Sequence, residues 1–359
     1  MDKTIKTVRG NPLAAEPLGR LLIKFAIPSV LSMLVDALYN IVDQIFIGRG
    51  VGYLGIAATT VTFPFVTILL SIATLLGIGG SVYTSMNLGA GKEAEAEKTL
   101  GTVFTLSVAI GILFTVICLT FLKPLALAFG ATKGAQGSLS YVLDYAPIIL
   151  LGAPFSMAAI ALSSMARACG SPILAMGCFL VGAVINLVLD PIYIFVFNWG
   201  VKGAAIATVT SQIMSAVILL VYFLKKGHIR LRRKNICPTL PICGQIFAFG
   251  LPSCMIQVAV TILQIELNKA VVSCEMAGVG SEAALSSLGI VLRISSVVVS
   301  ICVGIALGMQ PIIGFNKGAG FEHRVKETYK KAVGAATVVS VIGWLICELF
   351  PAEILQILG

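Results

Sequence analysis

The chain has 359 residues, of which 58% are hydrophobic and 11% are charged, and its mean hydropathy is +1.00. Soluble domains are about half apolar and about a quarter charged, so this composition excludes an ordinary soluble domain. The net charge of +9 would suit a nucleic-acid partner, but its distribution along the chain argues against one.

Apolar runs long enough to cross a bilayer, at about 20 residues per helix, recur along the whole chain. They do not alternate with period 2, so we expect an all-α polytopic membrane protein. The expected spans are 21–47, 56–83, 100–122, 139–165, 172–197, 203–224, 244–272, 284–314 and 328–349, with a tenth beginning near Pro351.

Basic residues gather in three segments, 3–24, 225–234 and 317–331, whereas the alternate loops hold few. The positive-inside rule then predicts a multi-pass protein whose N-terminus is cytoplasmic. Loops of this charge face anionic lipid head groups, so we expect membrane lipids and no nucleic acid as partners. We expect the protein to be a monomer.

An internal repeat divides the chain. "FAIPS" at 25–29 recurs as "FGLPS" at 249–253, and "NLGAGKEAEAEKT" at 87–99 recurs as "NKGAGFEHRVKET" at 316–328. Both copies start on the same side, which predicts two parallel-repeat lobes. We expect a six-helix N-terminal lobe at 1–224, a basic linker at 225–243 and an incomplete lobe of about three helices at 244–359. The full form would have twelve helices; the alternative is a natural nine- or ten-span protein.

The first span carries Asp36 and Asp43 seven residues apart, with Asn40 between them at helical spacing. All three fall on one face of a helix, and Tyr39 lies on its flank. A carboxylate at the bilayer centre costs about 2.5–3.5 kcal/mol, so such acids usually have a function.

The fifth span offers a second acid in "NLVLDP", where Asn186 and Asp190 stack at i, i+4 and Pro191 removes a backbone donor. That proline either frees carbonyl oxygens for a cation or merely bends the helix. Counting residues from the cytoplasmic side puts Asp43 and Asp190 at similar depth. In one poorly solvated cavity, two carboxylates disfavour each other's ionisation and attract a proton, Na⁺ or an organic cation. A structural polar cluster is the alternative.

The seventh span has a polar stripe that faces either a cavity or a neighbouring helix. Glu266 lies off this stripe and could pair with Arg293 of the eighth span, in a structural or a functional role. The stripe consists of Gln257, Thr261, Gln264 and Asn268.

Five motifs in order resemble the multidrug and toxic compound extrusion (MATE) transporters, most closely the branch of Gram-positive multidrug efflux proteins. They are "IPSVLSMLVDALYNIVDQIFIGRGVGYLGIAA", "GIGGSVYTSMNLGAGKEAEAEK", "NLVLDPIYIF", "GAAIAT" and "GMQPIIGFNKGAG". The resemblance implies twelve helices around a central cavity. It also implies export of organic cations in exchange for Na⁺ or H⁺ across a bacterial inner membrane.

The family's N-lobe cation site maps onto five residues of this sequence, which the resemblance therefore implies as ligands of the coupling ion. A glutamate that some members carry in the seventh helix is replaced here by Val260, and Glu266 does not inherit its role. The five residues are Tyr39, Asp43, Asn186, Asp190 and Thr208.

We therefore expect a secondary antiporter and no enzyme, because both histidines lie in loops and no catalytic set is evident. It would need no cofactor beyond the coupling ion, with Na⁺ held by Asp43, Asn186 and Asp190 if Na⁺ is that ion. The alternatives are a flippase for lipid-linked precursors, which would be expected to line its cavity with cationic groups, and an inactive fragment.

Overall fold

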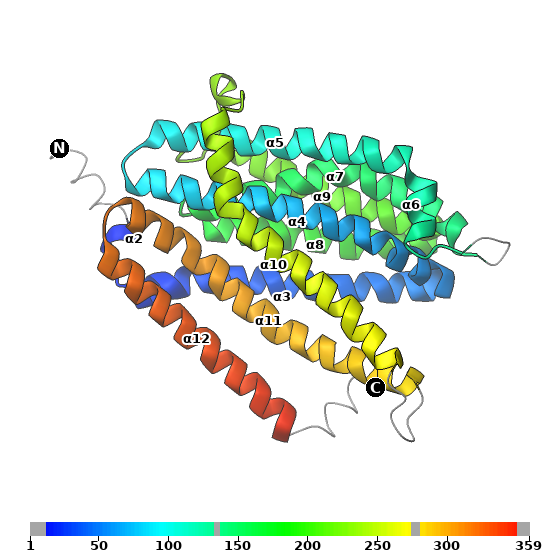
Figure 1. Ribbon diagram of the computed structural model, residues 1–359. Helices are drawn as coiled ribbons and strands as arrows, with labels where there is room; N and C mark the ends of the chain where they lie inside the picture. Colours follow the sequence, from blue (N-terminus) through cyan, green and yellow to red (C-terminus); the bar gives the residue numbers. More distant parts are fainter. Residues whose placement is uncertain (1–11, 133–136, 274–280, 350–359) are drawn as a thin grey trace.

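The computed structural model describes residues 12–132, 137–273 and 281–349, and this part of the chain is helical throughout (Figure 1). Nine of its helices are long and apolar enough to cross a membrane, which agrees with the expected fold class. The expected tenth span near Pro351 lies outside the described residues. The long helices are α3 (Leu18–Gly50), α4 (Tyr53–Gly89), α5 (Glu93–Thr120), α7 (Leu139–Ala168), α8 (Pro172–Pro191), α9 (Gly200–Lys225), α10 (Leu240–Ser273), α11 (Ser281–Gly318) and α12 (Glu322–Leu349).

Four short elements complete the described chain. They are α2 (Pro12–Ala15), α6 (Leu122–Ala128), a π-helical turn η1 (Ile192–Val196) and a 3₁₀ turn η2 (Arg233–Asn235). Most of the long helices extend past the apolar runs expected from the sequence at one end or both, whereas α8 ends at Pro191, within the expected span 172–197. The 37 residues of α4, at 1.5 Å each, span about 55 Å against about 30 Å of hydrocarbon. Apolarity marks the lipid-facing part of a helix, and the helix itself continues into the interfacial region.

Among the first six long helices, α7 is the central one. This helix contacts α4, α5 and α9, and Ala161, Leu162 and Met165 on it are fully buried. The helices α3 and α8 pack against each other at the side of this group. Because lipid gives no hydrophobic driving force between helices, close packing of small residues has to supply the contact energy.

The last three helices lie along one side of the others: α10 packs on α4, and α11 packs on α3, α4 and α12 (Figure 1). The closest approach is between the ends of α4 and α11. A Cβ atom at Gly89 would lie 2.8 Å from the carbonyl carbon of Phe315, and one at Gly318 would lie 2.7 Å from that of Met86. Only glycine lets the two backbones meet this closely.

The repeat seen in the sequence recurs in the turns that follow these two helices. Gly91 has φ 72° and Gly320 has φ 78°, a left-handed conformation that suits glycine. The amide of Lys92 donates to the carbonyl of Asn87, and that of Phe321 to the carbonyl of Asn316, both at 2.8 Å. The two copies of the motif therefore end their helices in the same way.

Short segments on the side of these turns tie the first and last helices together. The Arg324 guanidinium donates to the carbonyls of Leu13 (3.3 Å) and Glu16 (2.9 Å), which fixes the chain before α3 against α12. The side chain of Glu97 on α5 accepts from Asn235 at 3.4 Å and pairs with Arg232 at 3.3 Å, which fixes the chain before α10.

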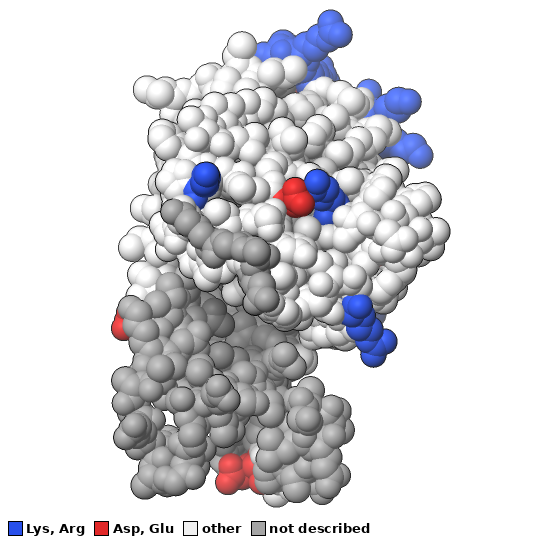
Figure 2. Space-filling view, turned by 90° about the vertical axis from the view of Figure 1, so that its right-hand side faces the viewer, with Lys and Arg blue, Asp and Glu red and all other residues white. Residues whose placement is uncertain are grey.

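The end of the bundle that bears these turns and the basic segments is called the basic end below. The described part of the opposite end, which faces the viewer in Figure 2, is mostly uncharged, with a few basic and a few acidic side chains. One ion pair there joins Lys202 of α9 to Asp144 of α7 at 3.1 Å. This asymmetry matches the expected charge distribution of the loops.

Candidate functional site

Two acids from distant parts of the chain meet where α3 packs on α8. Asp43 has 8% of its surface exposed and Asp190 has 0%, and their side chains are within hydrogen-bonding reach of each other. The structure thus places next to each other the two acids that the sequence put at similar depth. Two adjoining carboxyl groups inside a helical bundle repel each other when both are ionised, so the pair favours binding a positive charge.

The pair has few hydrogen-bond donors around it. Gln44 donates to Asp43 Oδ2 at 3.5 Å, and Asn186 donates to Asp190 Oδ1 at 3.4 Å, which are long for hydrogen bonds. The other oxygens, Asp43 Oδ1 and Asp190 Oδ2, are buried and have no hydrogen-bond partner in the described part of the chain. A buried carboxylate oxygen without a partner is costly, and a proton or a cation between the two groups would relieve that cost.

Two neutral oxygen groups lie next to the acids. Asn186 is 1% exposed, and its amide also donates to Thr208 Oγ1 of α9 at 3.4 Å. Hard cations prefer such carboxylate, amide and hydroxyl oxygens. The residues Asp43, Asn186, Asp190 and Thr208, referred to below as the acid pair and its neighbours, are thus chemically able to hold Na⁺ or a proton.

The proline after Asp190 marks a change of helix type. The α-helix α8 ends at Pro191, and the chain continues as the π-helical turn η1, which the amide of Phe197 closes by donating to the carbonyl of Ile192 at 3.0 Å. The expected disturbance at Pro191 is therefore present. Single π-helical turns are frequent at functional sites because they reposition the side chains and carbonyls beside them.

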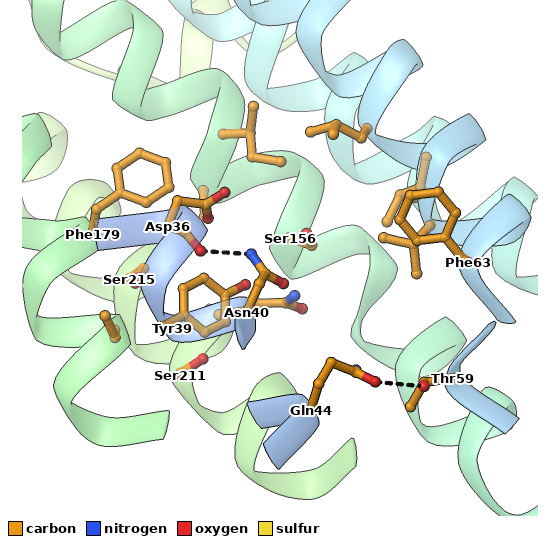
Figure 3. A pocket seen from close by; sticks show the side chains of 18 of the residues that line it. Asp36, Tyr39, Asn40, Gln44, Thr59, Phe63, Ser156, Phe179, Ser211 and Ser215 are labelled. Atoms are coloured by element: carbon orange, nitrogen blue, oxygen red, sulfur yellow. Dashed lines mark hydrogen bonds between the residues drawn. The ribbon is translucent and has the colours of Figure 1, made fainter. Parts of the chain in front are cut away.

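A cavity of about 620 Å³ opens beside the acid pair among α3, α4, α7, α8 and α9 (Figure 3). Asp36, Tyr39 and Asn40 line it, together with aromatic and hydroxyl side chains of the other helices. Asp43 does not line it, although the sequence predicted all three polar residues of this face in one place. The reason is that α8 packs over α3 at the level of Asp43 and covers its side chain.

The three remaining polar residues of the first span differ in their contacts. Tyr39 lines the cavity and is near enough to interact electrostatically with Asp36, Asp43 and Asp190. The Asn40 amide donates to the backbone carbonyl of Asp36 at 2.7 Å, a bond within its own helix (Figure 3). The carboxylate of Asp36 forms no hydrogen bond or ion pair with the described residues.

Three residues near the acid pair were missed in the sequence. Gln44 lines the cavity, bonds Asp43 and accepts from Thr59 Oγ1 at 3.0 Å (Figure 3). Tyr145 of α7 is within electrostatic reach of both acids of the pair. Gln44 could have been found as the polar neighbour of Asp43, whereas no local pattern marks Thr59 or Tyr145.

The polar stripe of the seventh span is described only in part. Gln257 and Thr261 are half-buried on α10, where Thr261 Oγ1 donates to the carbonyl of Gln257 at 2.9 Å. Neither lines the cavity. The side chains of Gln264, Asn268 and Arg293 lie outside the described residues, so the suggested pairing of Glu266 with Arg293 is not tested.

The sequence matches the MatE family over residues 28–192 and 252–359. The chain belongs to the MatE family. The two matched segments begin at Pro28 and Pro252, which are equivalent positions of the internal repeat. The resemblance to MATE transporters seen in the motifs is therefore confirmed.

Named relatives agree with this assignment. The chain is 28% identical over 328 residues to the multidrug export protein MepA of Staphylococcus aureus (strain MSSA476), which covers 91% of this chain and 70% of that protein. It is 29% identical over 338 residues to MepA of Staphylococcus haemolyticus (strain JCSC1435), covering 92% of this chain and 73% of the other.

Solved structures share the fold. An outward-facing multidrug resistance MATE family transporter of the MOP superfamily superposes with a TM-score of 0.88 at 24% identity, covering 99% of this chain and 76% of that one. A MOP superfamily transporter from Pyrococcus furiosus gives 0.87 at 24% identity, with the same coverage. Membership of the MatE family, together with the nine candidate spans of the described residues, makes this protein a multi-span membrane transporter and not an enzyme.

Proposed function

We propose that this MatE protein is an antiporter that exports organic cations in exchange for Na⁺ or H⁺, with the coupling ion held by Asp43 and Asp190. The main support is the pair of adjoining buried carboxyl groups, each with one oxygen that lacks a hydrogen-bond partner among the described residues. Asn186, Thr208 and Tyr39 would complete the site. The MepA relatives are named multidrug export proteins, which supports drugs as the exported molecules.

We also propose that the chain forms two lobes, 1–224 and 244–359, joined by the linker 225–243 and related by an axis along the membrane normal. The equivalent turns at Gly91 and Gly320 and the two family matches support this division. Alternating access then follows if the ion binds the two arrangements of the lobes with different affinity. The N-terminus and the basic end would lie in the cytoplasm.

The flippase alternative gains no support from the cavity. The substrate of a flippase for lipid-linked precursors bears an anionic phosphate, so the flippase would need cationic side chains along the substrate's path. Among the described residues that line the cavity, none is Lys, Arg or His, and Asp36 is an acid. The chemistry of this cavity favours a cationic cargo instead.

The test is export of a cationic dye by the purified protein in vesicles, with a Na⁺ gradient and a pH gradient applied separately. One of the two gradients should drive export, and either Asp43→Asn or Asp190→Asn should abolish that dependence. Loss of one charge from a pair that binds as a unit removes most of the ion affinity. Gradient-driven export that persists in either variant would refute the assignment of the coupling site.

The matched control is Asp144→Asn, the same chemical change at an exposed ion pair of the opposite end. Exposed pairs contribute less than about 1 kcal/mol, so this variant should behave like the wild type. Equal loss in Asp144→Asn and Asp43→Asn would show that the assay reports general damage to the protein.

A further inference from the structure

Asp36 is the one acid of the first helix that the coupling site leaves unused. It lies two helical turns before Asp43, about 10 Å away along the axis. It lines the cavity, whereas Asp43 is covered by α8. The two carboxylates of one helix thus face different surroundings, and they are available to different positive charges.

The wall around Asp36 has the chemistry of a site for an organic cation. Tyr39 and Phe179 lie on the same side of the cavity as Asp36, and Phe63 lies across from them (Figure 3). Aromatic faces attract cations, and the serines and amides along the wall offer further acceptors. The cavity volume of about 620 Å³ lies in the range of pockets that hold drug-sized molecules.

A side chain connects this cavity to the acid pair. Gln44 lines the cavity and its amide nitrogen donates to Asp43, while its amide oxygen accepts from the hydroxyl of Thr59 on α4. On the other side, Ser211 lines the cavity and donates to the backbone carbonyl of Thr208 at 2.7 Å. The hydroxyl of Thr208 in turn accepts from Asn186 at 3.4 Å. Occupation of the cavity can therefore alter the acid pair without direct competition for its carboxylates.

We propose that Asp36 is the counter-ion for the cargo: it selects monocationic aromatic molecules over neutral molecules of the same shape, while the coupling ion occupies Asp43 and Asp190. This inference rests on the proposed transport function and adds to it that cargo and ion bind different carboxylates. Both charges can then be bound at once, so exchange operates through a change in shape and not through displacement of one cation by the other.

The test compares binding of two probes of similar size to the purified protein by equilibrium dialysis. Methyltriphenylphosphonium is a monocation, and triphenylphosphine oxide is neutral. Asp36→Asn should weaken binding of the cation about tenfold, as expected for loss of a partly desolvated charge partner. Binding of the neutral probe should change less than about twofold, because the cavity keeps its shape.

Two further variants keep the outcome clear. Asp36→Glu retains the charge and should keep most of the preference for the cation. Ala183→Trp fills the cavity that Ala183 lines and should weaken binding of both probes. Equal effects of Asp36→Asn on the two probes, or unchanged cation binding, would overturn the role of Asp36. Cation binding unaffected by Ala183→Trp would place the cargo elsewhere.

Failure of this inference and failure of the coupling site give different results. Asp43→Asn should abolish gradient-driven export yet leave equilibrium binding of the phosphonium within about threefold of the wild type, since its charge is two turns from Asp36. If Asp43→Asn weakens phosphonium binding as strongly as Asp36→Asn does, cargo and ion share one site and the proposed separation is wrong. Intact gradient-driven export in Asp43→Asn would instead contradict the coupling site.

Discussion

The contact between α4 and α11 at the basic end makes a sharp prediction for Gly89→Ala. The new Cβ would lie 2.8 Å from the carbonyl carbon of Phe315, whereas ordinary contact begins at 3.4 Å. The backbones must therefore separate by at least 0.6 Å, the difference between these two distances, and by more to clear the carbonyl oxygen, which lies closer still. Overpacking of this kind costs about 1–3 kcal/mol.

That cost falls on the arrangement in which the two helices touch. If the protein exchanges between this arrangement and one that is open at the basic end, the equilibrium shifts by a factor of about 5 to 150. Gly318→Ala should act alike, because its Cβ would lie 2.7 Å from the carbonyl carbon of Met86 in the equivalent contact. Alanine also favours a helix over glycine by about 1 kcal/mol, but this gain applies to both arrangements and leaves the equilibrium between them unchanged.

The assay is a distance distribution between spin labels at Lys92→Cys and His323→Cys, two exposed positions at the basic end, after replacement of the nine native cysteines. The wild type should show mainly the short distance, and Gly89→Ala should increase the long component. Gly334→Ala is the control, since its Cβ would meet no atom within 4 Å. Unchanged distributions in Gly89→Ala and Gly318→Ala, or the same change in Gly334→Ala, would refute the reasoning.

Two further predictions concern single side chains. Thr208→Val should lower the affinity for the coupling ion about fivefold, because one hydrogen-bonding oxygen is worth about 1 kcal/mol. The ion concentration at half-maximal export measures this affinity, and Thr208→Ser should restore it. An affinity equal to that of the wild type in Thr208→Val would exclude the hydroxyl from the site. Arg324→Ala removes the hydrogen bonds to the carbonyls before α3. A protease should then cleave that segment several times faster than in the wild type, and Arg324→Lys should give an intermediate rate. An unchanged cleavage rate would show that other contacts hold the segment.

The sequence was informative where a rule of chemistry is strong. Long apolar runs can only be helices in lipid, so the nine spans followed from composition. Charged groups in such runs are so costly that Asp43 and Asp190 stood out, and a count of residues from the membrane surface was enough to place them together. The repeated glycine motifs predicted equivalent turns because each turn is a local structure.

Other parts of the site depend on how helices are rotated and packed. Gln44 and Thr59 come from α3 and α4, and their bond exists because these helices adjoin at that level. Asp36 and Asp43 share a face in sequence, yet α8 covers one and leaves the other at the cavity. Helix packing in lipid follows from many weak contacts between small residues, so no short pattern encodes it.

The glycine contacts at the basic end also define a pivot. The 38 residues of α11 reach about 57 Å from Gly318 to the far end of the helix. In the arrangement where these two helices touch, a rotation of about 10° around this point would move the far end by about 10 Å, while the backbones at Gly89 and Gly318 would hardly separate. Close packing at the two glycines would therefore couple a sub-ångström change at the basic end to a movement of several ångströms at the opposite end.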